Sequence, residues 1–177
     1  LLDSEHRYRD LVETSHDLVW TTDPQGRFTY LNTAAQDIFG LPPRDLSGRC
    51  FFDFEAGNAH IANRRFLAML KRGGEVKNYV THVVTARGED RWIGINARAL
   101  LDENREVKGI RGTARDITEQ HVATRRIEHL AMHDTLTDLP NRALFADRLQ
   151  TAIALAKRSG LLALHYLNID KFRPINE

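Results

Sequence analysis

Residues 76–115 decide the fold, and they read VKNYVTHVVT ARGEDRWIGI NARALLDENR EVKGIRGTAR. Three stretches of this segment are rich in β-branched and aromatic residues, which favour strands: 76–86, 91–101 and 107–115. Short polar turns separate them, at Arg87-Gly88-Glu89 and at residues 102–105. The pattern predicts three long strands joined by tight hairpins.

The residues before this segment add two shorter strands and three helices. Residues 18–22 and 27–31 flank Asp23-Pro24-Gln25-Gly26, a sequence typical of a type I turn, and predict a further antiparallel hairpin. Apolar residues three or four positions apart predict helices over 4–15 and 59–71. Thr33 and Gln36 match a capping box, which predicts a short helix over 33–39. We therefore expect an α+β fold, a five-stranded antiparallel sheet with helices packed on one side.

The residues after the sheet predict a linker and the start of another domain. Residues 119–134 are polar, lack glycine and proline, and carry a loose apolar seam, so we expect a connector helix that could dimerise. Phe145, Leu149 and Ile153 lie four residues apart and predict the next helix, and 161–169 reads as a buried strand. The predicted organisation is 1–118, 119–134 and 135–177.

Composition narrows the class of protein. The 177 residues include 25 Lys and Arg against 24 Asp and Glu, a net charge of +1 that argues against a nucleic-acid partner. The single cysteine, Cys50, allows no internal disulfide and suits the cytoplasm. The best apolar run, 161–169, is shorter than the roughly 18 residues of a membrane helix. The first residue is not Met, so we expect a fragment of a longer protein, whose other segments could anchor it to a membrane.

Residues 1–118 resemble a PAS sensor domain with its C-terminal PAC half. The matching motifs are Asp17-Leu18-Val19-Trp20, Asp23-Pro24-Gln25-Gly26-Arg27, Tyr30-Leu31-Asn32, Arg87-Gly88-Glu89-Asp90-Arg91-Trp92 and Gly112-Thr113-Ala114-Arg115-Asp116-Ile117-Thr118-Glu119. The resemblance implies the PAS fold, in which haem, flavin or a small metabolite can lie between the sheet and the helices.

The residues that could line such a sensor pocket are Trp20, His60, Phe66 and Trp92. His60 is the candidate haem ligand, although most such histidines are surface residues, and we expect no haem. Cys50 lacks the sequence context of a photoreactive flavin domain. Ordinary core packing is the preferred interpretation of Trp20 and Trp92, and a small-molecule ligand remains an open alternative.

Two places along the chain could relay a signal. Asp116 and Thr118 stand where the last strand meets the linker helix, and their side chains can cap the helix and bond to the sheet. In PAS proteins the corresponding motif is implied in signal output. Asp134 and Arg142 could pair and fix how the linker enters the second domain.

Residues 133–142, His-Asp-Thr-Leu-Thr-Asp-Leu-Pro-Asn-Arg, resemble the start of a GGDEF domain of the diguanylate cyclase family, and 144–149 and 168–177 continue the match. The resemblance implies an α/β domain, with Mg and GTP bound only when the domain is complete. It places the metal at Asn168 and the backbone of Ile169, the phosphate at Arg173 and guanine at Asn176. The family has Asp where this chain has Asn168, and a neutral carbonyl binds Mg²⁺ less well.

The two resemblances together predict a sensory fragment of a cyclic di-GMP signalling protein. The G-G-D-E-F motif is missing from the chain, so the chain alone is not expected to be catalytic. A degenerate GGDEF domain that regulates an EAL phosphodiesterase is favoured over an active cyclase. The alternatives are the PAS module of a histidine kinase and a PAS domain that only dimerises, and a homodimer is expected through the PAS domain and the linker. His133 lacks the Arg-Thr-Pro that follows a kinase phosphoacceptor histidine.

Overall fold

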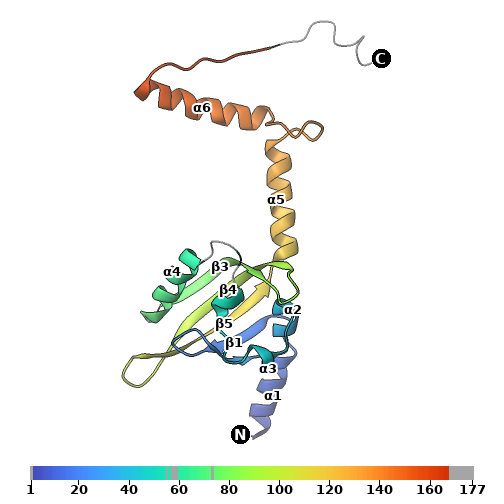
Figure 1. Ribbon diagram of the computed structural model, residues 1–177, viewed down its shortest axis with the longest axis vertical. Helices are drawn as coiled ribbons and strands as arrows, with labels where there is room; N and C mark the ends of the chain where they lie inside the picture. The colour runs from blue at the N-terminus through green and yellow to red at the C-terminus, as the bar shows by residue number, and fades with distance from the viewer. Residues whose placement is uncertain (1, 55, 57–59, 73, 168–177) are drawn as a thin grey trace. The chain divides into compact units, whose positions relative to one another are not determined.

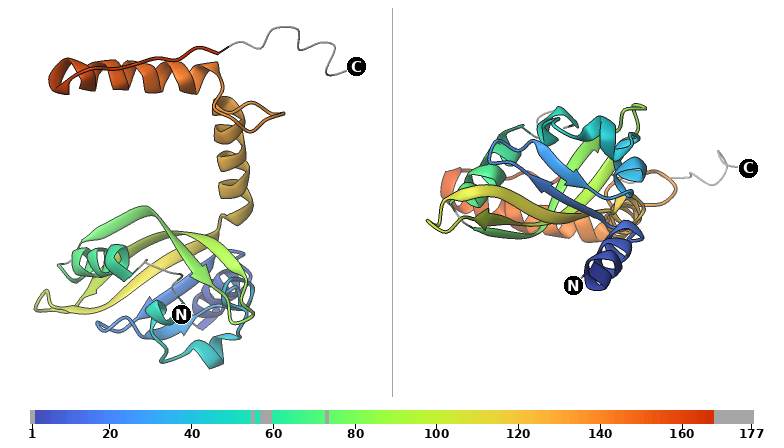
Figure 2. Two further views of the ribbon diagram at one scale, coloured as in Figure 1. Left: turned by 45° about the horizontal axis from the view of Figure 1, so that its top comes forward. Right: turned by 90° about the horizontal axis from the view of Figure 1, so that it is seen from below.

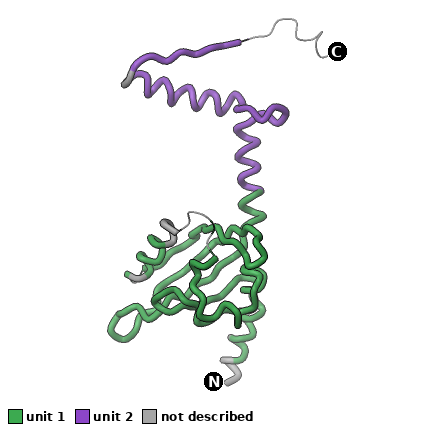
Figure 3. The backbone as a smooth tube through the Cα atoms, viewed as in Figure 1, with its two compact units in different colours: residues 1–122 green, residues 123–177 purple. Residues whose placement is uncertain are grey.

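The structure is a computed structural model that describes residues 2–54, 56, 60–72 and 74–167 (Figure 1). The chain divides into two compact units, residues 1–122 and 123–177 (Figure 3).

The first unit is built on one five-stranded antiparallel sheet in the order β2-β1-β5-β4-β3 (Figure 2). Its strands are β1 Leu18–Thr22, β2 Phe28–Leu31, β3 Glu75–Val84, β4 Asp90–Leu101 and β5 Val107–Asp116. The shorter hairpin, β1 and β2, joins the longer meander where β1 pairs with β5, with Leu18 opposite Ala114. The strands predicted for this sheet are confirmed, with bounds that differ by at most two residues.

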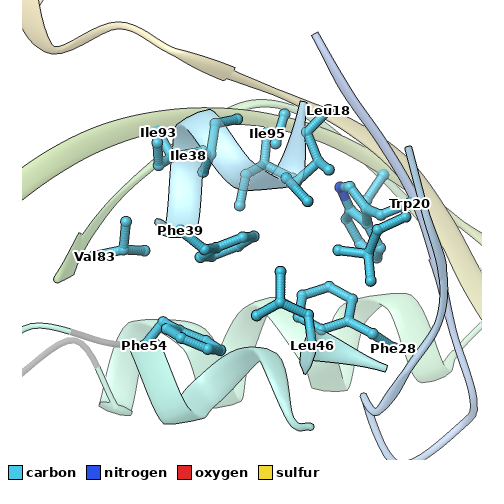
Figure 4. Packing of buried hydrophobic residues seen from close by; sticks show 14 of the residues in the cluster. Leu18, Trp20, Phe28, Ile38, Phe39, Leu46, Phe54, Val83, Ile93 and Ile95 are labelled. Carbon is cyan, nitrogen blue, oxygen red and sulfur yellow. The ribbon is translucent and has the colours of Figure 1, made fainter. Parts of the chain in front are cut away.

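Helices cover one face of this sheet, and an aromatic and aliphatic core fills the space between. The covering helices are α2 Ala35–Phe39, α3 Pro43–Leu46, the short 3-10 helix η1 Phe51–Phe54, and α4 His60–Lys71. Helix α1 Leu2–Glu13 instead lies beside the other face, where its Val12 meets Val19 of β1. The rings of Phe39 and Phe54 lie 4.9 Å apart in the middle of the core (Figure 4). Ile93, Ile95 and Ala97 alternate along β4 and are all buried on this face. The predicted α+β architecture is confirmed.

Gly112 on β5 shows how closely the central strands pack. A Cβ atom at this position would collide with the backbone carbonyl oxygen of Asn96 and lie 2.8 Å from Cζ2 of Trp20. Only glycine therefore allows β5 to run between β1 and β4 with the Trp20 ring buried beneath it.

Two further helices follow the sheet. Helix α5, Thr118–Met132, follows the sheet directly, and α6, Arg142–Ser159, lies in the second unit. Asn141 caps α6, since its side chain accepts hydrogen bonds from Ala143 N and Leu144 N. None of the helices in the described ranges is long and apolar enough to cross a membrane.

The strand predicted over 161–169 is not formed in residues 161–167, which are exposed and irregular. A strand needs a hydrogen-bonded neighbour, and the described part of this unit contains no other strand to pair with. Residues 168 and 169 lie outside the described residues.

Candidate functional site at the junction of the sheet and helix α5

Asp116, the last residue of β5, caps helix α5. Its Oδ1 accepts hydrogen bonds from Thr118 N at 2.8 Å and from Thr118 Oγ1 at 2.5 Å. A carboxylate here satisfies a helix donor that has no partner within the helix, and its charge suits the positive end of the helix dipole. The capping role predicted from the sequence is therefore available to Asp116.

The same carboxylate is tied to the neighbouring strand by Arg91. Arg91 Nη1 donates to Asp116 Oδ2 at 2.7 Å, and Arg91 Nη2 donates to Glu89 Oε2 at 2.8 Å. Burial alone would raise the pKa of Asp116, but the hydrogen bonds from Thr118 and the charge of Arg91 outweigh it and lower that pKa below its usual value. Asp116 is thus held in its charged form between two strands and a helix.

Two hydrogen bonds of the Trp92 backbone connect β4 to the start of α5. Trp92 N donates to Thr118 Oγ1 at 2.9 Å, and Ile117 N donates to Trp92 O at 2.8 Å. The first residue of α5 is therefore fixed by hydrogen bonds to β4 as well as to the end of β5. A movement of β4 relative to β5 would have to change at least one of these bonds.

Trp92 makes a second link between the sheet and the helix, through stacked rings. Its ring lies between His82 of β3, at a centroid distance of 4.8 Å, and His121 of α5, at 4.1 Å, with 17° between the planes in each pair. His82 Nε2 also lies 2.9 Å from Asp90 Oδ1. Sequence reasoning missed His121, because no local pattern reveals a stack of three residues from three elements.

Of the four residues predicted for a sensor pocket, the three whose side chains the structure describes, Trp20, Phe66 and Trp92, do not all line one pocket. Trp20 and Phe66 are both buried on the helix-covered face, where Trp20 packs edge-on against Phe28 and Phe66 stacks on Tyr79. Trp92 occupies the opposite face, because its neighbour Ile93 points into the core. His60 begins α4, and its side chain lies outside the described part of the chain.

In the second unit, Asp134 organises the turn after α5. Its Oδ1 accepts hydrogen bonds from Thr137 Oγ1 at 2.8 Å, Thr137 N at 2.9 Å and Leu136 N at 3.2 Å. These bonds, the one from the Thr137 hydroxyl first, lower the pKa of Asp134 below its usual value. Asp134 and Arg142, which the sequence suggested as a pair, form no ion pair with each other, and Arg142 is simply the first residue of α6.

Asn141, and not that pair, connects α5 to α6. Its Nδ2 donates to Ala131 O at 2.8 Å and its backbone N donates to Met132 O at 2.9 Å, while its Oδ1 caps α6. One asparagine therefore binds the end of α5 and the start of α6. Next to it, His129 stacks on His133 at 4.1 Å and lies 2.6 Å from Asp138 Oδ1.

The second resemblance assigns metal and nucleotide binding to Asn168, Ile169, Arg173 and Asn176. All four lie outside the described residues. Their roles stay predictions.

Comparison with known proteins gives two family matches. The family model described as "PAS fold" matches residues 12–122, and the one described as "Diguanylate cyclase, GGDEF domain" matches residues 131–177. Both resemblances inferred from the motifs are confirmed.

Relatives and a solved structure agree with these matches. The chain is 26% identical over 168 residues to the cyclic di-GMP phosphodiesterase PdeR of Escherichia coli (strain K12), covering 94% of this chain and 25% of that protein. It is 43% identical over 56 residues to the bifunctional diguanylate cyclase/cyclic di-GMP phosphodiesterase MucR of Pseudomonas aeruginosa, covering 31% of this chain and 8% of that protein. The chain thus spans a quarter or less of the length of these relatives. The crystal structure of the PAS domain of a protein from Colwellia psychrerythraea superposes with a TM-score of 0.57 at 20% identity, over 66% of this chain and 99% of that chain, and shows the fold alone.

Proposed function

We propose that this chain, which belongs to the PAS fold family and continues into the first part of a GGDEF domain, is the regulatory part of a cyclic di-GMP signalling protein. In this proposal the state of the PAS domain sets how helix α5 leaves the sheet. The helix then passes that state to the GGDEF domain.

The observation that carries the proposal is the double anchoring of the first turns of α5. Asp116 binds Thr118 of the helix and Arg91 of β4, while His121 stacks on Trp92, also of β4. Because both anchors involve β4, a rearrangement of that strand acts on the helix through two separate contacts. A signal needs only to bind two arrangements of this junction with different affinity to shift their populations.

We propose that the parent protein acts on cyclic di-GMP and that the PAS domain regulates this activity. Asn168 in the metal position favours a GGDEF domain that regulates a phosphodiesterase over one that makes cyclic di-GMP, since Mg²⁺ prefers charged oxygen ligands. The similarity to PdeR, a phosphodiesterase, and to MucR, a bifunctional enzyme, supports this direction. The match of residues 131–177 to the GGDEF family gives the histidine kinase alternative less support.

We also place this part of the protein in the cytoplasm as a homodimer. Its one cysteine, Cys50, is free, which suits a reducing compartment. Helix α5 has no buried residue among those described, and it exposes Val122, Ile127 and Leu130. These apolar side chains support pairing of α5 with its copy in a second chain.

The test of this proposal is to identify the nucleotide that the full-length protein turns over. The purified protein is incubated with GTP and Mg²⁺, and separately with cyclic di-GMP, and the nucleotides are resolved by chromatography. We expect cyclic di-GMP to be consumed while GTP stays unchanged. Formation of cyclic di-GMP from GTP would contradict the direction proposed from Asn168, and no turnover of either nucleotide would contradict the cyclic di-GMP function itself.

A further inference from the structure

Two arginines face each other on the side of the sheet opposite the core. Arg98 of β4 is the direct cross-strand partner of Arg111 of β5. The register continues from Arg111 to Thr21 of β1 and on to Tyr30 of β2, so these four residues form one row across the sheet. Like charges in directly opposed positions of a sheet are destabilising unless something neutralises them.

The described chain does not supply the neutralising charge. Glu75 of β3 is the cross-strand partner of Arg98, but its carboxylate lies 3.7 Å from Lys77 Nζ instead. Neither Arg98 nor Arg111 forms an ion pair with a carboxylate in the ranges that the structure describes. The described residues therefore place no carboxylate against this pair of like charges.

A groove of about 650 Å³ lies directly over this pair. Its floor includes the next outward-facing row, Val19, Thr113 and Asn96, and α1 forms a wall with Arg9 and Val12. Asn96 Oδ1 accepts a hydrogen bond from Asn78 N at 2.9 Å, which leaves the amide nitrogen of Asn96 as a donor. Cationic and neutral donors thus line a partly apolar hollow, and Glu75, held near Lys77, is the acidic residue in its lining.

We propose that this groove binds a small organic anion, whose carboxylate or phosphate bridges Arg98 and Arg111 and whose apolar or aromatic body lies toward Val12 and Val19. Guanidinium groups bind such anions through paired, charge-assisted hydrogen bonds, and a ligand pocket typically combines a few such polar groups with apolar walls. A second copy of the chain suits this face less well, since a two-fold contact over the groove would bring the arginines of both copies together.

This inference goes beyond the proposed function, because binding is measured on the chain itself and needs no nucleotide turnover. The purified chain is titrated by calorimetry, and its melting temperature is followed, with three probes: inorganic phosphate, decanoate and cyclic di-GMP. We expect saturable binding and a rising melting temperature with decanoate or with cyclic di-GMP, and a much weaker effect of inorganic phosphate. Binding of decanoate identifies a carboxylate ligand, and binding of cyclic di-GMP identifies a phosphate ligand.

Charge-removing variants locate the site. Arg98→Gln and Arg111→Gln are each expected to weaken binding at least about tenfold, because each removes a charge-assisted pair. Both should leave the melting temperature of the free chain equal or higher, since they relieve the repulsion between the two arginines. Arg44→Gln is the matched control, because Arg44 lies in α3, outside the groove, with 86% of its side chain exposed.

Three results would overturn the proposal. The first is no saturable binding of either organic probe. The second is an equal loss of binding in Arg44→Gln, which would mean general attraction of anions to the protein. The third is a change of oligomeric state in Arg98→Gln or Arg111→Gln with ligand binding unaffected, which would make the groove a contact between copies of the chain.

Discussion

At the residue scale, the carboxylate of Asp116 joins three elements, β5, β4 and α5. Its two oxygens are used separately, Oδ1 by Thr118 and Oδ2 by Arg91. An asparagine at this position could not keep both interactions, since it has one acceptor oxygen and no charge to attract Arg91. The negative charge of Asp116 is therefore as important as its shape.

The first prediction concerns how stability changes at low pH. Because the pKa of Asp116 is lowered in the folded chain, its contribution to the free energy of unfolding is complete above the unfolded value of about 4 and is lost as the pH falls through the folded value. We expect Asp116→Asn to be less stable than the parent sequence at pH 7, with a difference that shrinks below about pH 4. Urea unfolding of both proteins between pH 7 and pH 3 measures this.

The control for this prediction is Asp37→Asn, since Asp37 is exposed on α2. It should follow the parent sequence at every pH. A stability difference between Asp116→Asn and the parent that stays constant down to pH 3 would show that the charge of Asp116 does not stabilise the fold.

The sequence predicts the cap formed by Asp116 but not the ring stack beside it, because the cap is local in sequence and the stack is not. A helix cap depends on residues two or three positions apart, so Asp116 and Thr118 could be identified locally. The stack of His82, Trp92 and His121 depends on strand register and on where the helix starts. The Asp134–Arg142 pair failed in the opposite way, because Thr137 lies closer to Asp134 in the chain and its backbone and hydroxyl groups occupy the carboxylate.

At the scale of elements, α5 is joined to the sheet by a ring stack as well as by a cap. His121 stacks on Trp92 at the end of the first turn, so the cap fixes where the helix begins and the stack fixes its direction. The strands themselves were predictable because alternate residues of β4 are buried, a pattern visible in the sequence. Residues 161–167 show the limit of that reasoning, since an apolar run specifies burial but does not supply a partner strand.

The second prediction tests the stack. His121→Ala should speed amide hydrogen exchange in the first two turns of α5 by about two- to thirteenfold, because loss of an aromatic pair costs about 0.5–1.5 kcal/mol. Exchange in β4 and β5 should stay the same, since their ladder does not include this ring. Hydrogen exchange followed by mass spectrometry measures both regions in one experiment.

His129→Ala is the matched control, since His129 is also a stacked histidine of α5 but contacts His133. It should leave the first two turns unchanged. Equal exchange in His121→Ala and the parent sequence would mean that the stack does not hold the helix.

At the scale of the whole molecule, the chain is two compact units connected through one helix, α5. No residue of that helix is buried in the described part of the chain, although it carries apolar side chains. An exposed apolar seam on a helix between two domains is typical of a helix that pairs with a partner. This feature supports the dimer proposed above.

The third prediction follows from that seam. Ile127, with 68% of its surface exposed, contributes nothing to the core of either unit. Ile127→Glu should therefore leave the melting temperature of the isolated monomer unchanged while weakening the dimer at least about tenfold, because it places like charges in the helix pair. Light scattering over a range of protein concentrations measures the dissociation constant.

Glu128→Gln on the same helix is the control, and it should keep the dimer. A monomer at all concentrations in the parent sequence, or an unchanged dimer in Ile127→Glu, would show that α5 does not mediate pairing.

The most direct test of the central claim is the cyclic di-GMP turnover of the full-length protein with Asp116 replaced. The account predicts that Asp116→Ala changes the rate at least about threefold, because the start of α5 loses its cap and its tie to Arg91. Asp37→Ala, an exposed change on the same unit, should keep the parent rate, and circular dichroism should show both variants folded. A folded Asp116→Ala protein with the parent rate would contradict the claim that this junction carries the signal.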